Sequence, residues 1–289
     1  MASRRPVVPR GRTARDPLAP RAPRPRKRFG QHFLEATWIA KIADALALAP
    51  SDTVVEIGPG RGAITRALAA RAAHVLAVEI DRDLTAALGA EAPPNVRVLC
   101  RDFLTMSLEE IEASGARVRV VGNLPYYVST PILIRLIEWA RQSPVLVDAT
   151  LMLQKEVAER VASPPGSKSY GTLSVVAQTV ADVEWLLDVP AGAFRPVPSV
   201  ESAVIRLRFR GPTSLPPTLD GLVKGLFSQR RKTLANALRT TCPHVLTTAF
   251  EDVLRDLGVS SRARPETLTP AQFVELARAL DGLPRRPAS

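Results

Sequence analysis

Thr53-Val-Val-Glu-Ile-Gly-Pro-Gly-Arg-Gly62 joins an apolar, β-branched run to three glycines at alternating positions. The apolar run predicts a buried strand, the glycines predict a tight loop, and residues 63–71 predict a helix. A strand that leads through a glycine-rich loop into a helix is typical of nucleotide-binding α/β proteins. Glu79 ends the next predicted strand, 74–79, where a carboxylate can accept hydrogen bonds from ribose hydroxyls.

The same alternation of strand and helix continues along the chain. Further strands are expected at 96–100, 117–121, 149–154, 183–188 and 202–209, and helices at 38–46, 82–90, 131–139 and 155–162. This pattern predicts a parallel sheet with helices on both faces.

Composition divides the chain into three parts. Residues 1–28 hold ten of the 39 Lys and Arg and one of the 28 Asp and Glu, which leaves 29 basic and 27 acidic residues, a net charge of +2, for the rest. We therefore expect a disordered, basic Arg- and Pro-rich leader at 1–27, suited to nucleic acid. A solubilising tail or a targeting segment is the alternative interpretation of this leader.

The rest of the chain is expected to form two domains. The α/β domain is expected at 28–211. After a Pro-rich linker only helical patterns follow, so 212–289 is expected to form a small all-helical domain.

The hexapeptide Gly122-Asn-Leu-Pro-Tyr-Tyr127 is placed between a predicted strand and a predicted helix, at the usual ligand-binding edge of an α/β sheet. The Asn123 amide can accept and donate hydrogen bonds, Pro125 stiffens the backbone, and the tyrosines supply flat rings. This combination can hold an amino group while a ring stacks on the heterocycle that carries it. A plain turn with two half-buried tyrosines is the alternative interpretation.

The acids near the glycine loop favour one class of cofactor over another. A pyrophosphate, as in NAD, prefers a helix N-terminus free of acids, yet Glu56 precedes the loop. The sulfonium and ammonium of S-adenosylmethionine tolerate a nearby carboxylate, and Asp102, after the third strand, can accept from an adenine amino group. We therefore favour a methyl donor over NAD.

The sequence also bears on metal binding and on the setting of the protein. Cys100, Cys242 and three scattered histidines indicate no metal site. The chain shows neither a membrane span nor a signal peptide, which favours a cytoplasmic setting.

Several motifs in combination resemble the ribosomal RNA adenine N6-dimethyltransferases of the KsgA/RsmA type, within the class I methyltransferase superfamily. Besides the two motifs above they are Gly30-Gln-His-Phe-Leu34, Glu79-Ile-Asp81, Gln154-Lys-Glu-Val-Ala-Glu-Arg160, Lys168-Ser-Tyr-Gly-Thr-Leu-Ser-Val175, Phe194-Arg-Pro-Val-Pro-Ser-Val200 with Ser202, and the run 227–236. The resemblance covers residues 29 to about 238. It implies a Rossmann-like fold and dimethylation of two adjacent adenosines near the 3′ end of small-subunit (16S) ribosomal RNA, with a role in subunit biogenesis.

The resemblance also implies roles for individual residues. The donor S-adenosylmethionine is expected to bind at His32, Leu34, Gly58, Gly60, Glu79, Asp102 and Asn123. The Asn123 amide and the Leu124 carbonyl are expected to accept hydrogen bonds from adenine N6, beside Pro125, with the base between Tyr126 and Phe194. His32 and Tyr127 each replace an Asn that is more usual in the family.

RNA is expected to bind along a cationic helix that carries Lys224, Arg230, Arg231, Lys232 and Arg239, with Arg195 and the basic leader assisting. The expected partner is the precursor of the small ribosomal subunit, and the expected state is a monomer. The alternatives are an Erm-like enzyme that methylates 23S ribosomal RNA, a mitochondrial paralogue that also acts in transcription, a non-catalytic RNA-binding assembly factor and, more distantly, an NAD oxidoreductase.

Overall fold

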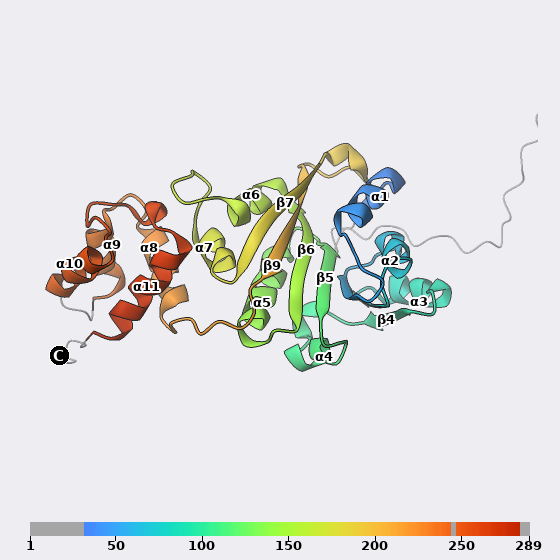
Figure 1. Ribbon diagram of the computed structural model, residues 1–289. Helices are drawn as coiled ribbons and strands as arrows, with labels where there is room; N and C mark the ends of the chain where they lie inside the picture. The colour runs from blue at the N-terminus through green and yellow to red at the C-terminus, as the bar shows by residue number, and fades with distance from the viewer. Residues whose placement is uncertain (1–31, 244–246, 284–289) are drawn as a thin grey trace, which may run out of the picture.

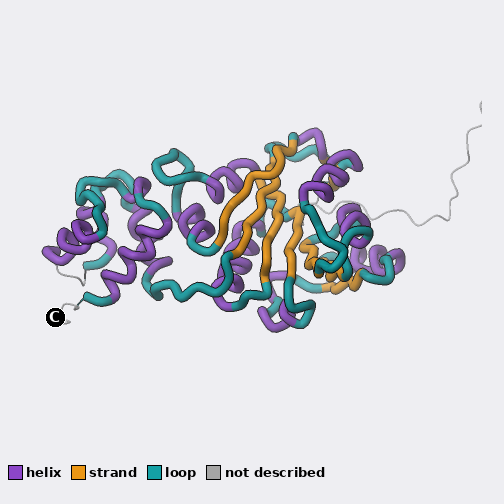
Figure 2. The backbone as a smooth tube through the Cα atoms, in the orientation of Figure 1, coloured by secondary structure: helices purple, strands orange, loops and turns teal. Residues whose placement is uncertain are grey.

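The computed structural model describes residues 32–243 and 247–283, so the expected leader at 1–27 lies outside the described residues. A seven-stranded sheet forms the centre of the molecule, and a separate group of four helices, α8 to α11, lies beyond one edge of it (Figures 1 and 2). None of the described helices is long and apolar enough to cross a membrane.

The sheet has the strand order β4-β3-β2-β5-β6-β9-β7. Its strands are β2 (Thr53–Ile57), β3 (His74–Glu79), β4 (Val96–Cys100), β5 (Val118–Asn123), β6 (Leu146–Gln154), β7 (Ala181–Val189) and β9 (Ser202–Phe209). Strands β2 to β6 pair in parallel as expected, whereas β9 runs antiparallel to both β6 and β7. The reason is the connection from β7 to β9, which lacks the crossover helix that a parallel neighbour requires.

Helices cover both faces of the sheet, as the sequence predicted. They are α1 (Ala36–Ala45), α2 (Ala63–Ala69), α3 (Arg82–Glu91), α4 (Leu108–Glu112), α5 (Ser129–Gln142), α6 (Lys155–Ala162) and α7 (Thr172–Gln178). Strand β2 shows how the two faces differ, because Val54 packs with Ile64 and Leu68 of α2, while Val55 and Ile57 join the cluster of α5 to α7 on the other side. The sequence analysis missed α4 and α7, which are only five and seven residues long.

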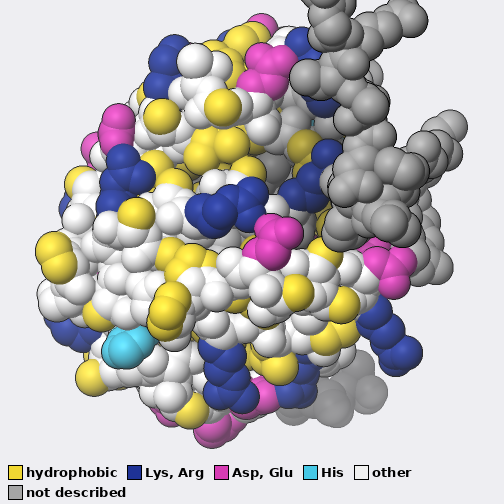
Figure 3. Space-filling view, turned by 90° about the vertical axis from the view of Figure 1, so that its right-hand side faces the viewer, with side chains coloured by type: hydrophobic (Ala, Val, Ile, Leu, Met, Phe, Trp, Pro, Cys, Tyr) yellow, Lys and Arg dark blue, Asp and Glu magenta, His cyan; other side chains and the backbone are white. Residues whose placement is uncertain are grey.

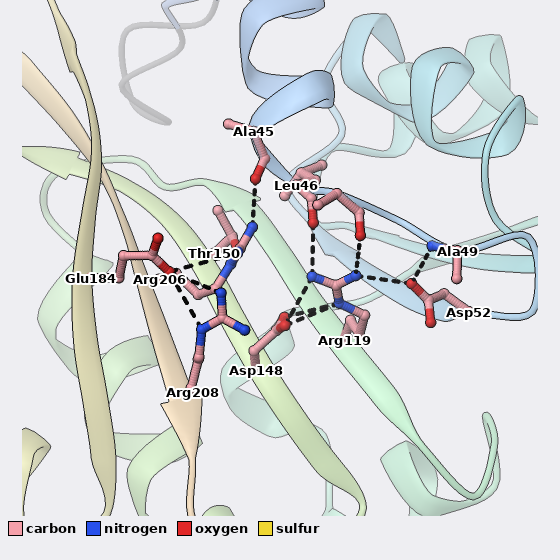
Figure 4. Close-up of polar contacts among 11 residues, drawn as sticks. Ala45, Leu46, Ala49, Asp52, Arg119, Asp148, Thr150, Glu184, Arg206 and Arg208 are labelled. Carbon is pink, nitrogen blue, oxygen red and sulfur yellow. Dashed lines mark hydrogen bonds and ion pairs between the residues drawn. The ribbon is translucent and has the colours of Figure 1, made fainter.

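Two arginines, Arg206 fully buried and Arg119 largely buried, fix the carboxyl end of α1 to the sheet (Figure 4). Arg119 of β5 donates to the carbonyl oxygens of Leu46 at 2.8 Å and Ala47 at 3.2 Å, and pairs with Asp52 and Asp148 at 2.9 Å each. Arg206 of β9 donates to Ala45 at 2.5 Å. These bonds satisfy carbonyls at the end of the helix that have no partner within it, so α1 is held against β5 and β9.

A two-stranded sheet, absent from the sequence prediction, joins distant parts of the chain. Strand β1 (Phe33–Leu34) pairs antiparallel with β8 (Phe194–Arg195), which places Leu34 opposite Phe194. Strands of two residues carry no periodicity, so only the tertiary fold reveals them.

The helices α8 (Leu219–Ser228), α9 (Leu234–Thr241), α10 (Thr247–Asp256) and α11 (Pro270–Asp281) build a second core. The expected cationic helix is not continuous, and this part of the prediction was wrong. Thr233 has an extended backbone, with φ −64° and ψ 155°, so α9 begins only at Leu234. Arg230, Arg231 and Lys232 therefore lie in the turn between α8 and α9.

Candidate active site

The site lies where the strand order reverses. Strand β2 has β3 on one side and β5 on the other, and ligands of open α/β sheets bind at the carboxyl ends of strands at such a point. The loop after β2 turns on Gly58, Gly60 and Gly62, with φ of 67°, 59° and 73°, a region that favours glycine. A Cβ on Gly58 would lie 3.9 Å from the carbonyl oxygen of Asn123, so the two principal motifs adjoin.

A single cavity of about 430 Å³ joins the two motifs. Its lining includes every residue to which a catalytic or donor-binding role was assigned from the sequence: His32, Leu34, Gly58, Gly60, Glu79, Asp102, Asn123, Leu124, Pro125, Tyr126 and Phe194. They come from β1, β8 and the carboxyl ends of β2, β3, β4 and β5, so the fold collects residues from 32 to 194 around one space.

At one end of the cavity, Asn123 and Tyr126 are held by neighbours from other parts of the chain. The Asn123 Nδ2 donates to the His32 carbonyl oxygen at 3.5 Å, and the Tyr126 hydroxyl lies 3.0 Å from Ser202 Oγ. The rings of Tyr126 and His32 are nearly parallel, with centroids 6.1 Å apart. Because Nδ2 is engaged, the Asn123 Oδ1 is the atom of this amide available to accept a hydrogen bond.

His32 and Phe194 also line the cavity, and both are fixed by their neighbours. His32 Nδ1 donates to the Pro196 carbonyl oxygen at 2.7 Å, so the imidazole is fixed by the loop that follows Phe194. Phe194 is only 2% exposed and packs with Ile42 and Val204, yet it also lines the cavity. The ring therefore belongs to the wall and is already immobilised.

At the other end the cavity is lined by acids. Glu79 Oε2 accepts from the Gly60 N–H at 3.0 Å and Oε1 accepts from the Asp81 N–H at 3.0 Å. Burial raises the pKa of Glu79, although these N–H groups oppose the change. Burial, reinforced by the charge of Glu79, raises the pKa of Glu56 to about 7. Asp102 accepts from the Leu104 N–H at 2.9 Å and is half-buried.

These acids fit a cationic cofactor better than a pyrophosphate. The Oε2 atom of Glu56 is buried without a hydrogen-bond partner among the described residues, and a buried acid next to the glycine loop repels phosphate and attracts a sulfonium or an ammonium. The donor set therefore fits S-adenosylmethionine, with Glu79 and Asp102 placed for hydroxyl and amino groups.

The basic side chains expected to bind RNA do not share one surface. Arg195 adjoins the cavity and pairs with Glu35 at 2.7 Å, whereas the others belong to α8, α9 and the turn between them and line no part of the cavity. Lys224, Arg231 and Lys232 are exposed. Arg230 is half-buried and donates to the Ser167 carbonyl oxygen at 3.2 Å. On the face shown in Figure 3, cationic side chains are mixed with acidic and apolar ones, in keeping with the nearly neutral body inferred from the composition.

Two contacts of this site were not predicted from the sequence. The Tyr126 hydroxyl contacts Ser202, a residue that belongs to the family resemblance but received no role from it, because the two residues lie 76 positions apart and meet only in the fold. Arg61 lies over the ring of Phe33, with its guanidinium carbon 4.1 Å from the ring centre, and both residues line the cavity.

Comparison with known proteins agrees with this geometry. The family described as ribosomal RNA adenine dimethylase matches residues 23–281. Proteins named ribosomal RNA small subunit methyltransferase A are similar in sequence. That of Acidithiobacillus ferrooxidans is 44% identical over 89% of this chain and 95% of its own length, and that of Xylella fastidiosa is 42% identical over 89% and 96%.

Solved structures show the same fold. A dimethyladenosine transferase from Plasmodium falciparum superposes with a TM-score of 0.71 at 25% identity, covering 85% of this chain and 96% of its own. The 23S rRNA methyltransferase ErmE superposes with a TM-score of 0.64 at 28% identity, covering 86% and 99%. The chain therefore belongs to the ribosomal RNA adenine dimethylase family and is an S-adenosylmethionine-dependent RNA methyltransferase.

Proposed function

We propose that the protein transfers two methyl groups to N6 of each of two adjacent adenosines near the 3′ end of small-subunit (16S) ribosomal RNA, and so takes part in small-subunit biogenesis. The observation that carries this proposal is the single cavity that joins Asn123, Tyr126 and Phe194 to the acid-lined glycine loop. The names of the relatives at 42–44% identity support the small subunit as the source of the RNA.

The residues of the cavity would divide the work between two ligands. Gly58, Gly60, Glu79 and Asp102 would hold S-adenosylmethionine together with His32, Leu34 and the backbone of Asn123. The donor, when bound, would supply a methyl carbon on a sulfonium; the amine forms the N–C bond as the C–S bond breaks and a neutral thioether leaves, so no nucleophilic side chain is needed. Glu56 also lines the cavity, where a bound cation would favour the ionised form of its carboxyl group.

Asn123 and Leu124 would orient the adenine. The Asn123 Oδ1 and the Leu124 carbonyl accept hydrogen bonds from the N6 amino group, which directs the nitrogen lone pair along the line of transfer. Tyr126 stacks on one face of the extruded base, and Phe194 covers the other. Each stacked ring contributes about 1–3 kcal/mol toward holding the base outside its helix. The proton leaves N6 after the N–C bond forms, so water can take it.

The position of Tyr126 supports this arrangement. Its hydroxyl is held by Ser202, and the backbone before it is stiffened by Pro125, so the ring is oriented before any base arrives. One chain supplies all these residues, so the site needs no second subunit, which favours a monomer. Action in the cytoplasm is favoured because the proposed substrate is ribosomal RNA.

The decisive experiment is mass spectrometry of ribosomal RNA after incubation with isotopically labelled donor. Isolated small-subunit particles and naked 23S RNA are offered separately, and we expect labelled dimethyladenosine only in the former. Label only in 23S RNA would instead support the Erm-like alternative, to which the likeness with ErmE gives some weight. Label in neither, without heat of donor binding in calorimetry, would favour a non-catalytic assembly factor.

A further inference from the structure

Four large hydrophobic side chains are exposed among the residues that the structure describes, and they belong to three loops. They are Ile80, Tyr127, Val197 and Val200, which are 46%, 59%, 57% and 41% exposed. We call these four residues the apolar rim. Scattered exposed apolar residues are ordinary, but exposed ones gathered at one place indicate a binding surface.

The rim adjoins the cavity. Ile80 and Tyr127 themselves line it. The loop that carries Val197 and Val200 is tied to the cavity wall at both ends, because the Pro196 carbonyl accepts from His32 and Ser202 contacts Tyr126. The rim is thus continuous with the site where the target base is expected.

The charges around the rim indicate what would cover it. Arg61, Arg66 and Arg101 line the same cavity, and Arg195 precedes the loop of Val197. Arg101 pairs with Glu110 and Arg195 with Glu35, but both ion pairs are accessible to solvent and leave guanidinium N–H groups for phosphate. Arginine beside exposed aromatic and aliphatic side chains is the combination that binds single-stranded nucleic acid, in which phosphates contact the cations and bases stack on the rings.

We propose that Tyr127 is a stacking platform for the nucleotide next to the target adenine, with Val197 and Val200 beside it. This inference rests on the proposed function. When a base leaves its strand, its neighbour is deprived of a stacking partner. Tyr127 directly follows Tyr126. The Tyr126 ring would stack on the target base, and the Tyr127 ring would stack on the neighbouring base in place of the target base that has left the strand. Tyr127 is exposed, whereas Tyr126 is half-buried, so the Tyr127 ring is open to a base from outside the cavity.

The test compares the wild type with Tyr127→Phe, Tyr127→Leu and Tyr127→Ala in methylation of isolated small-subunit particles. Stacking needs the ring but not the hydroxyl, so we expect Phe to match the wild type. Ala should raise the KM for particles about 5- to 150-fold, the range for removal of one base–aromatic stack, and Leu should lie between. The dissociation constant for S-adenosylmethionine, measured by calorimetry, should stay unchanged in all four proteins.

A second measurement reports the stacking directly and does not depend on turnover. An RNA hairpin with the sequence of the methylated end carries 2-aminopurine next to the target adenine, and a ring stacked on that base quenches its fluorescence. We expect quenching with the wild type and Phe variants and its absence with Ala. The same hairpin built on the 23S sequence keeps the test valid if the proposed small-subunit target is wrong.

Two outcomes would overturn the inference. The first is a Tyr127→Ala variant with normal KM and normal quenching. The second is a variant that is impaired on particles but quenches 2-aminopurine normally, which would assign the rim to contact with a ribosomal protein.

Discussion

The Tyr170 hydroxyl donates to the carbonyl oxygen of Leu268 at 2.8 Å, across 98 positions of the chain. Tyr170 belongs to the loop before α7 yet is buried in the core of the C-terminal helices, where its ring meets Phe227 edge-on. The Gly166 N–H donates to the Glu266 carbonyl at 2.7 Å nearby. These contacts fix the C-terminal helices relative to the sheet, and they give the Lys168-Ser-Tyr-Gly motif a physical role.

Removal of this hydroxyl should therefore weaken the seam between the two cores. Tyr170→Phe keeps the ring but leaves the Leu268 carbonyl without its donor, and we expect a decrease of about 1–3 kcal/mol in the free energy of unfolding. Urea denaturation of the wild type and of Tyr170→Phe measures this difference in the free energy of unfolding. Tyr127→Phe removes the same atom from an exposed ring and should change stability by less than about 0.5 kcal/mol. Equal effects of the two substitutions would contradict the prediction.

The buried ion pair of Arg119 and Asp148 allows a second stability test. Both side chains are nearly inaccessible, so Arg119→Met leaves a buried carboxylate and two helix-end carbonyls unpaired, at a cost of about 3–5 kcal/mol. The double variant Arg119→Met/Asp148→Leu should recover part of that stability. Arg208, whose pair with Glu184 is exposed at 3.1 Å, is the matched control, and Arg208→Met should cost less than about 1 kcal/mol.

These two interactions illustrate what sequence reasoning can and cannot reach. The strands 53–57, 74–79, 96–100 and 202–209 were predicted to the residue, because apolar periodicity and glycine punctuation are local. The antiparallel direction of β9, the β1–β8 pair and the Tyr170 hydrogen bond were not predicted, because each depends on residues that meet only in three dimensions.

The same distinction applies to the site. Motifs at the ends of β2, β3 and β5 could be assigned to one edge because parallel strands end together. Phe194 and His32 were placed there by family resemblance alone, and the β1–β8 pairing supplies the physical reason. The prediction of one continuous cationic helix was wrong because it carried a helical pattern through Thr233, where the backbone is extended.

Glu56 should make stability depend on pH. The unfolded chain releases this proton near pH 4.5, whereas the folded chain holds it until about pH 7. Because the folded state binds more protons between these values, the contribution of Glu56 to stability falls as pH rises from about 4.5 to 7 and is constant above.

Glu56→Gln has no such proton to release. We therefore expect the difference in unfolding free energy, variant minus wild type, to increase by roughly 1.4 kcal/mol per pH unit across that window. Urea titrations at pH 5, 6, 7 and 8 measure it. Parallel pH profiles for the two proteins would show that the buried carboxyl titrates normally.

The turn between α8 and α9 should bind RNA through its exposed cations. Charge reversal by Arg231→Glu/Lys232→Glu should weaken binding to small-subunit RNA and flatten its salt dependence, by about 0.7–0.9 in the slope of log K against log salt for each phosphate that is no longer neutralised. RNA-binding titrations at several salt concentrations between about 50 and 200 mM measure this slope. Arg230 is left intact because its hydrogen bond to the Ser167 carbonyl oxygen belongs to the seam between the two cores.

Arg97→Glu is the matched control for this charge reversal. Arg97 is exposed on β4, the edge strand at the opposite end of the molecule from the C-terminal helices (Figure 1). An equal weakening of binding in Arg97→Glu would mean that net charge alone drives the interaction and that the turn has no special part in it.

Asn123 provides the sharpest test of the chemistry. Its Nδ2 is engaged by the His32 carbonyl, so Oδ1 remains to orient adenine N6, and a misplaced nucleophile costs on the order of 10²-fold in rate. We expect Asn123→Ala to lower kcat by about that factor, with donor affinity changed only a few-fold because the glycine loop and Glu79 are untouched. Asn123→Asp keeps an acceptor oxygen but cannot donate to His32, so it should retain more activity than Ala. Single-turnover methylation of small-subunit particles at saturating donor measures the chemical step, and a rate for Asn123→Ala near that of the wild type would remove this amide from the alignment of the base.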